Sequence, residues 1–327
     1  MTTKKAHAYL QSLLCCCYKV HSLHNRKHQQ EQPQFSRYIL YNRTIFFYYY
    51  RSVTNQKLDR VETLNKSMNQ SEGDDMVVTE NHDEILLFEQ HEHAKACGEF
   101  AKAWRDDYFI GDKKREKVIY AIYEHDNGWI QLDDQPILNK QTQIPYSFSN
   151  YPLKSKLKAY TNGINRIEKE DDYAALICSL HYASFFEGYT NGRGEGFLRQ
   201  ERRRQQNLIE KLNINTEDEE FRFHYNLLQF CDNLSLYLCM NRPGVDKKNE
   251  MIWFRNGFSQ KFHFNNERTI IAHWLDEETI TLTDFPFKQE VSVSIHYKSI
   301  KKRCLSNLQE EYERQQLQQR TVTIIKG

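Results

Sequence analysis

Ala-Ile-Tyr-Glu-His-Asp-Asn-Gly-Trp, residues 121–129, carries the strongest indication of fold and function in this 327-residue chain. A His-Asp pair ends an apolar helical segment, and Gly128, a residue typical of helix ends, follows. His125 offers a neutral nitrogen donor and Asp126 an anionic oxygen donor, a mixed pair with which a helical bundle can hold a metal ion. His-Asp pairs are common by chance, so this one gains meaning only from partners elsewhere in the chain.

Other apolar helical segments each supply one further donor type: His93, His181 and Asp232. Asp232 lies within Leu-Leu-Gln-Phe-Cys-Asp-Asn-Leu-Ser-Leu, residues 227–236, and a carboxylate buried there needs a partner. A metal ion is one such partner, and Arg166 is another. A single histidine on an apolar face is more often a hydrogen-bonded core residue than a ligand. His91 competes with His93, but the helical spacing points His91 away from the apolar face.

Composition excludes several classes of function. The 45 Lys and Arg residues nearly balance the 44 Asp and Glu residues, so charge gives no case for nucleic acid as a partner. No apolar run approaches the roughly 18–20 residues that cross a bilayer, so we expect a soluble protein without a membrane partner. The eight cysteines form no Cys-x-x-Cys pair, which is typical of buried thiols in the cytoplasm.

The first 75 residues differ from the rest. Glu31 is the only acidic residue before residue 58, and no helical or strand period persists there. A secretory signal is the weaker interpretation, because Gln11 and Ser12 interrupt the short apolar run. We expect residues 1–75 to be an unstructured or non-native extension, with Met68 or Met76 as alternative starts.

The remaining pattern predicts helices followed by strands. A β-hairpin is expected at 76–79 and 84–88, and a long loop at 129–155. The expected helices are 89–105, 113–126, 156–168, 171–186, 197–212 and 217–240. Antiparallel strands are expected at 252–258, 260–264, 269–274, 279–283 and 291–297, and a helix or frayed tail at 305–320.

Four segments together resemble an uncharacterised bacterial family, domain of unknown function 3891. They are Gln-His-Glu-His-Ala (90–94), His-Asp-Asn-Gly-Trp (125–129), Tyr-Ala-Ala-Leu-Ile-Cys-Ser-Leu-His-Tyr (173–182) and Cys-Asp-Asn-Leu-Ser-Leu (231–236). The resemblance covers residues 76–298 and brings no established activity. The order of His93, His125-Asp126 and Asp232 on helices also resembles the HD superfamily of metal-dependent phosphohydrolases.

The HD resemblance implies a mainly α fold, with an HD-like helical bundle over 76–245. A small C-terminal antiparallel β-sheet over 246–303 and a charged tail over 304–327 complete the expected organisation. His93, His125, Asp126 and Asp232 would bind a first divalent metal ion. Asp126 would bridge to a second ion, with His181 as the protein ligand of that ion. Such mixed ligation suits Mn, Fe, Zn, Ni or Co.

The same resemblance implies hydrolysis of a small phosphorylated molecule or nucleotide by metal-activated water. Arg166 would neutralise the developing charge, with the run Arg202-Arg203-Arg204 as an alternative that is more often a solvated face. Asp133 would transfer a proton or orient a ligand. Side chains of the long loop, among them Trp129, Asp133, Asp134 and Tyr146, either line the pocket mouth or only pack the loop.

Two other functions use the same donors. One is di-iron oxygenase-like chemistry, because a ligand set does not determine a reaction. The other is a non-catalytic module that binds a metal or another ligand, with the sheet and the charged tail as an interaction surface. The oligomeric state stays open.

Overall fold

The structure is a computed structural model that describes residues 76–187 and 192–327, so the expectations for residues 1–75 lie outside it. Its α-helices are α3 (Gln90–Ala103), α4 (Arg115–Glu124), α5 (Ile130–Asp133), α6 (Leu153–Glu170), α7 (Asp172–Ser184), α8 (Glu195–Leu212), α9 (Glu219–Met240) and α10 (Leu308–Arg314). Its strands are β1 (Val77–Glu80), β2 (Glu84–Phe88), β3 (Ala272–Trp274), β4 (Thr279–Leu282), β5 (Val291–Lys301) and β6 (Gln318–Lys326). The predicted hairpin and the six predicted long helices are confirmed, with small shifts at their ends.

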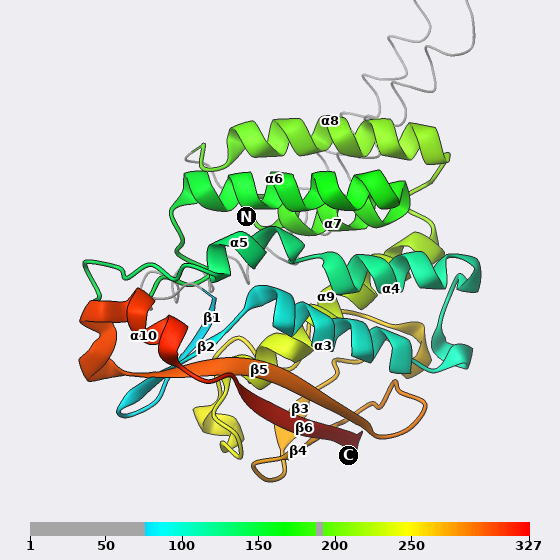
Figure 1. The fold of residues 1–327 in the computed structure, drawn as a ribbon. Helices are drawn as coiled ribbons and strands as arrows, with labels where there is room; N and C mark the ends of the chain where they lie inside the picture. Colours follow the sequence, from blue (N-terminus) through cyan, green and yellow to red (C-terminus); the bar gives the residue numbers. More distant parts are fainter. Residues whose placement is uncertain (1–75, 188–191) are drawn as a thin grey trace, which may run out of the picture. The chain divides into compact units, whose positions relative to one another are not determined.

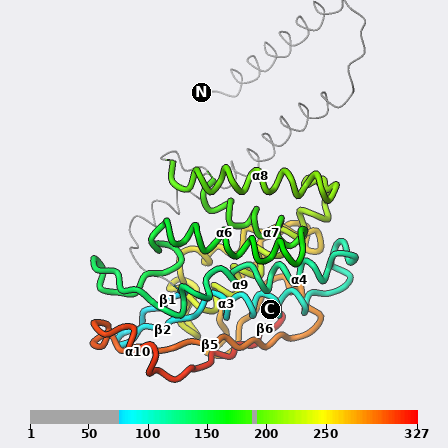
Figure 2. The backbone as a smooth tube through the Cα atoms, turned by 45° about the horizontal axis from the view of Figure 1, so that its top comes forward, coloured from blue at the N-terminus to red at the C-terminus, as the bar shows by residue number. Residues whose placement is uncertain are grey.

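Helices α3, α4, α6, α7, α8 and α9 stack in layers on one side of a sheet (Figure 1), whereas α10 contacts β5 apart from this stack. Helix α3 packs on β5 and also contacts α4 and α9, so it lies next to the sheet. Helix α7 contacts α4 and α9 on one side and α6 and α8 on the other, which places α8 farthest from the sheet (Figure 2). Asp171 caps the N-terminus of α7, because its carboxylate accepts a hydrogen bond of 2.9 Å from the backbone N–H of Ala174.

The sheet corrects the predicted fold class. It has six strands in the order β1-β2-β5-β6-β4-β3, and β4 and β6 run parallel. The expectation of an HD-like helical bundle with a small C-terminal antiparallel sheet is therefore wrong. The N-terminal hairpin joins the sheet through β2 and β5, with Phe88 opposite Tyr297. The last residues join it through β6, because Val322 and Ile324 on one face of that strand are buried.

Two predicted strands, 252–258 and 260–264, do not form; the segment consists of turns and a short 3-10 helix, His263–Asn265. Its aromatic residues Phe254, Phe258 and Phe262 recur every four residues and are buried. The ring of Phe258 lies 5.2 Å from that of Phe230 on α9, and the ring of Phe262 lies 5.0 Å from that of Trp104 at the C-terminal end of α3. Aromatic packing against two helices thus replaces strand pairing here.

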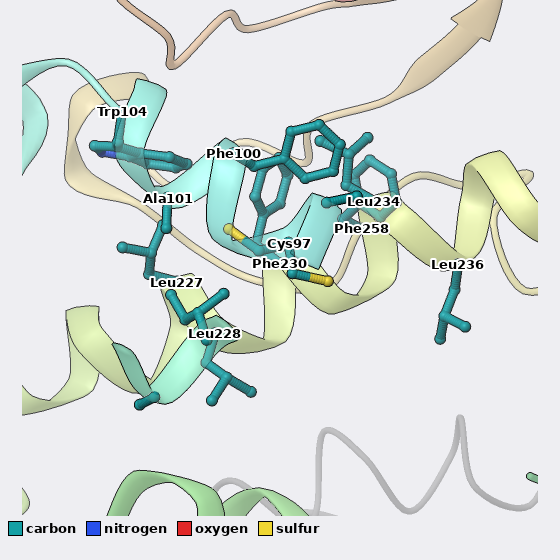
Figure 3. Packing of buried hydrophobic residues seen from close by; sticks show 14 of the residues in the cluster. Cys97, Phe100, Ala101, Trp104, Leu227, Leu228, Phe230, Leu234, Leu236 and Phe258 are labelled. Carbon is teal, nitrogen blue, oxygen red and sulfur yellow. The ribbon is translucent and has the colours of Figure 1, made fainter. Parts of the chain in front are cut away.

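The main core joins α3 to α9 (Figure 3). Phe100 of α3 and Trp104, the residue that follows this helix, pack with Leu227 and Phe230 of α9, and all four side chains are fully buried. Burying side chains of this size contributes about 1.5–3 kcal/mol each to folding. This packing fixes the two helices that carry His93 and Asp232.

Within residues 76–187 and 192–327, no helix has both the length and the apolar character needed to cross a membrane.

Candidate metal centre

The His-Asp pair lies just beyond the end of α4. The helix ends at Glu124, and His125 and Asp126 form the turn into a short 3-10 helix, Asn127–Trp129. Gly128 is not a left-handed helix stop. It permits a close approach instead, because a Cβ atom at Gly128 would overlap the backbone carbonyl oxygen of Ala159 on α6. The turn is therefore held directly against α6.

The structure brings the five predicted donors, His93, His125, Asp126, His181 and Asp232, together. His93 Nε2 lies 2.9 Å from Asp126 Oδ2 and 3.6 Å from Asp232 Oδ1. His125 Nε2 lies 3.4 Å from Asp126 Oδ2 and 3.7 Å from Asp232 Oδ1. His181 Nε2 lies 3.7 Å from Asp232 Oδ2. All five residues are buried.

The orientation of His125 leaves one ring nitrogen facing the carboxylates. Its Nδ1 donates a hydrogen bond of 2.8 Å to the backbone carbonyl of Ile122, so Nε2 carries the lone pair of the neutral ring. Nε2 is buried and has no hydrogen-bond partner among the described residues. Burial alone would lower the pKa of His125, but Asp126 and Asp232 outweigh it and raise the pKa to about 9. The ring thus needs a cation at Nε2, either a proton or a metal ion.

The donor separations fit a metal ion. Donors bound at roughly 2.1 Å lie about 3.0 Å apart at the edges of an octahedron and about 3.4 Å apart at those of a tetrahedron. The separations of 2.9–3.7 Å between imidazole nitrogens and carboxylate oxygens match these values. The buried His and Asp groups can therefore hold a metal ion, and three imidazoles with two carboxylates suit Mn, Fe, Co, Ni or Zn.

Cys97 is a further group near the centre. Its Sγ lies 3.8 Å from His93 Nδ1, and His93, Cys97 and His125 also form a group that could hold a metal ion. Burial and the nearby carboxylate of Asp232 raise the pKa of the Cys97 thiol well above its usual range. The carboxylates of Asp126 and Asp232 lie near Nε2 of His93, whereas Cys97 lies near Nδ1 on the other side of the same ring.

A pocket of about 350 Å³ opens onto the centre. His93, Asp126, His181 and Asp232 form part of its wall. Much of the remaining wall is aromatic, including Phe148, Tyr160, Phe185, Trp253, Phe254 and Phe258. Lys156 and Arg193 contribute cationic side chains to the same wall. Sequence patterns did not identify either cation, because neither belongs to a recognisable motif.

Asp133 and Arg166, the predicted auxiliary residues, do not line the pocket. Asp133 accepts a hydrogen bond of 2.7 Å from the backbone N–H of Gln90, so it caps the first turn of α3. Burial and the carboxylates of Glu89 and Asp126 raise the pKa of Asp133 well above its usual range, although the bond from Gln90 opposes this. Arg166 is exposed and donates to the backbone carbonyl of Asn127.

Most of the other residues considered from the sequence also fall outside the pocket wall, and Trp129 is the exception. Arg202 pairs with Glu187 at 3.0 Å, and Arg204 pairs with Glu201 at 2.9 Å. His91 is absent from the residues that line the pocket, whereas His93 is present. Of the loop residues, Trp129 lines the pocket and also packs on the rings of Tyr151 and Tyr160.

The model of a family described as "Protein of unknown function (DUF3891)" matches residues 76–302, a span that contains all five donors. No curated protein and no solved structure matches the chain. None of these comparisons supports the resemblance to the HD superfamily.

Proposed function

We propose that this chain, which belongs to the DUF3891 family of proteins of unknown function, is a metal-dependent hydrolase of small phosphate esters. The observation that supports the proposal best is the His125 Nε2 atom, buried without a hydrogen-bond partner and 3.4–3.7 Å from two carboxylates. Such an atom is costly to bury unless a hydrogen-bond donor or a cation meets it, and the two nearby carboxylates favour a cation. The open pocket beside it gives a substrate access to that cation.

The five donor residues would hold the metal ion. When bound, a divalent ion lowers the pKa of water and polarises a phosphoryl oxygen, which allows hydrolysis at neutral pH. In the reaction, the oxygen of water forms a bond to phosphorus and the ester bond to the leaving oxygen breaks. Water gives up one proton and the leaving oxygen gains one.

The pocket supports a phosphorylated organic molecule as substrate. Lys156 and Arg193 supply positive charge on the wall that carries the donors. The ammonium of Lys156 is held by the backbone carbonyls of Phe148 at 2.6 Å and Ser149 at 3.3 Å. The aromatic part of the wall would bury the organic part of the substrate and exclude water from it. A volume of about 350 Å³ suits a molecule of nucleotide size, which is the form of substrate that we expect.

Metal analysis combined with a panel of phosphomonoesters and phosphodiesters tests this function. We expect the purified protein to bind a divalent metal and to hydrolyse at least one ester on the panel. His125→Ala and Asp232→Ala should each lose the metal and lower kcat/KM by at least 100-fold. The matched control is His82→Ala, because the side chain of His82 is 97% exposed, and this variant should keep both properties.

Other outcomes would point to other functions. Bound iron with oxygen uptake and no ester hydrolysis would replace the proposal with oxygenase-like chemistry. A metal-free protein whose His125→Ala and Asp232→Ala variants keep the unfolding temperature of the unaltered protein would contradict any metal centre.

A further inference from the structure

One buried hydroxyl contacts both members of the His-Asp pair. Tyr182 Oη lies 2.7 Å from Asp126 Oδ1 and 2.6 Å from the backbone carbonyl oxygen of His125, so its single proton serves two acceptors. The ring of Tyr182 is 1% exposed and stacks on the ring of Tyr160, with centroids 3.9 Å apart. Tyr182 follows His181 on α7, so one helix carries both a donor and a group that contacts another donor.

The two oxygens of Asp126 therefore have different environments. Oδ1 is engaged by Tyr182, while Oδ2 lies near the imidazole nitrogens of His93 and His125. Asp232 differs, because its Oδ1 lies near His93 and His125 and its Oδ2 lies near His181. Among the described residues, imidazoles lie near one oxygen of Asp126 but near both oxygens of Asp232.

We infer that Tyr182 is a positioning residue that restricts Asp126 to one donor oxygen, which leaves Asp232 as the carboxylate shared between the His93–His125 side and the His181 side of the centre. This reverses the bridging role that the sequence resemblance implied for Asp126. Hydrogen bonds from outside the ligand set orient metal ligands, and their loss typically weakens metal binding 10–100-fold. The inference rests on the proposed metal binding and does not depend on which reaction the centre performs.

Cobalt(II) titration of Tyr182→Phe tests the positioning role. The substitution removes one oxygen atom and keeps the ring that stacks on Tyr160, so we expect the variant to fold. Its affinity for Co²⁺, measured by competition with a chelator, should fall 10–100-fold, and the visible absorption of bound Co²⁺ should change. The matched control is Tyr173→Phe, because the hydroxyl of Tyr173 is also buried and lies 2.6 Å from His224, a residue outside the donor set. Tyr173→Phe should leave the affinity and the spectrum unchanged.

A second pair of variants tests the shared role of Asp232 without altering Tyr182. In Asp126→Asn, the amide oxygen can keep the position of Oδ2, while the amide nitrogen donates to the Tyr182 hydroxyl and that hydroxyl donates to the His125 carbonyl. In Asp232→Asn, one of two oxygens that face imidazoles becomes a nitrogen that cannot act as a donor to the metal. Asp126→Asn should therefore retain at least tenfold higher affinity for Co²⁺ than Asp232→Asn.

The outcomes separate this inference from the proposed function. If the unaltered protein binds no Co²⁺ or other divalent metal, the proposed function fails and the inference fails with it. If the unaltered protein binds Co²⁺ and Tyr182→Phe binds it equally well with the same spectrum, only the positioning role is refuted. An affinity of Asp232→Asn equal to or above that of Asp126→Asn would refute the shared role of Asp232.

Discussion

At the scale of single residues, two buried histidines show how surroundings determine what an imidazole can do. Two carboxylates near His125 raise its pKa to about 9, so this ring favours a cation. His224 on α9 is equally buried, but its Nδ1 shares a hydrogen bond of 2.6 Å with the neutral hydroxyl of Tyr173. Burial then lowers the pKa of His224 to about 4, so this ring stays neutral and belongs to the core.

The low pKa of His224 predicts a loss of stability in acid. The unfolded chain binds a proton at His224 near pH 6.5, whereas the folded chain does so only near pH 4. The contribution of His224 to the free energy of unfolding is therefore complete above pH 6.5. It is lost as the pH falls toward 4, and the loss amounts to at most about 3 kcal/mol. Urea unfolding at several pH values should show this decline in the unaltered protein and a shallower one in His224→Gln, whose amide does not titrate. If the stability of the two proteins declined in parallel with falling pH, the lowered pKa of His224 would be contradicted.

At the scale of elements, the turn that carries His125 and Asp126 is set by contact between two glycines. A Cβ atom at Gly163 of α6 would lie 3.0 Å from the backbone nitrogen of Gly128 and 3.0 Å from Asn127 Oδ1. A Cβ atom at Gly128 would overlap the carbonyl oxygen of Ala159, which is backbone and cannot rotate away. Helix α6 thus supports the centre without contributing a donor to it.

Gly128→Ala should therefore weaken both the fold and the centre. Forcing a methyl group into such a contact costs about 1–3 kcal/mol and should move the turn that holds Asp126. We expect a lower unfolding temperature and weaker metal binding than in the unaltered protein, with a smaller effect in Gly163→Ala. Gly196→Ala on α8 is the control, because no described residue outside the backbone of its own helix comes within 4 Å of its Cβ position, and alanine favours the helix by up to about 1 kcal/mol. If Gly128→Ala lost stability but kept its metal affinity, the prediction that this turn positions the metal donors would be contradicted.

At the scale of the whole molecule, the features that could be predicted from the sequence are those that a local residue pattern determines. Apolar residues at helical spacing located the six long helices, and the polar donors on their buried faces identified the residues that the fold brings together. Pattern did not reveal pairing between distant segments, such as Phe88 with Tyr297 or the parallel pairing of β4 with β6. It also missed Tyr182 and Lys156, because a tyrosine or lysine in a helix has no signature until its partners are known.

The position of β6 in the sheet leads us to expect that folding depends on residues 318–326. β6 lies between β5 and β4, so without it the sheet would separate into β1-β2-β5 and β4-β3. It also buries Val322 and Ile324, each worth about 1.5–3 kcal/mol, in a protein whose total stability is expected to be about 5–15 kcal/mol. Arg320 of the same strand donates to the backbone carbonyl of Leu238 at 2.6 Å and so satisfies the end of α9, the helix that carries Asp232.

Deleting residues 316–327 should therefore abolish cooperative folding and metal binding together, although every metal donor is still present. Circular dichroism during heating should show no sharp transition, and calorimetry should detect no saturable Co²⁺ binding. Gln318→Ala is the control, because the side chain of Gln318 is exposed and the substitution keeps the backbone pairing of β6. A truncated protein that still unfolds cooperatively and binds Co²⁺ with the original affinity would show that the helices form the centre without the sheet.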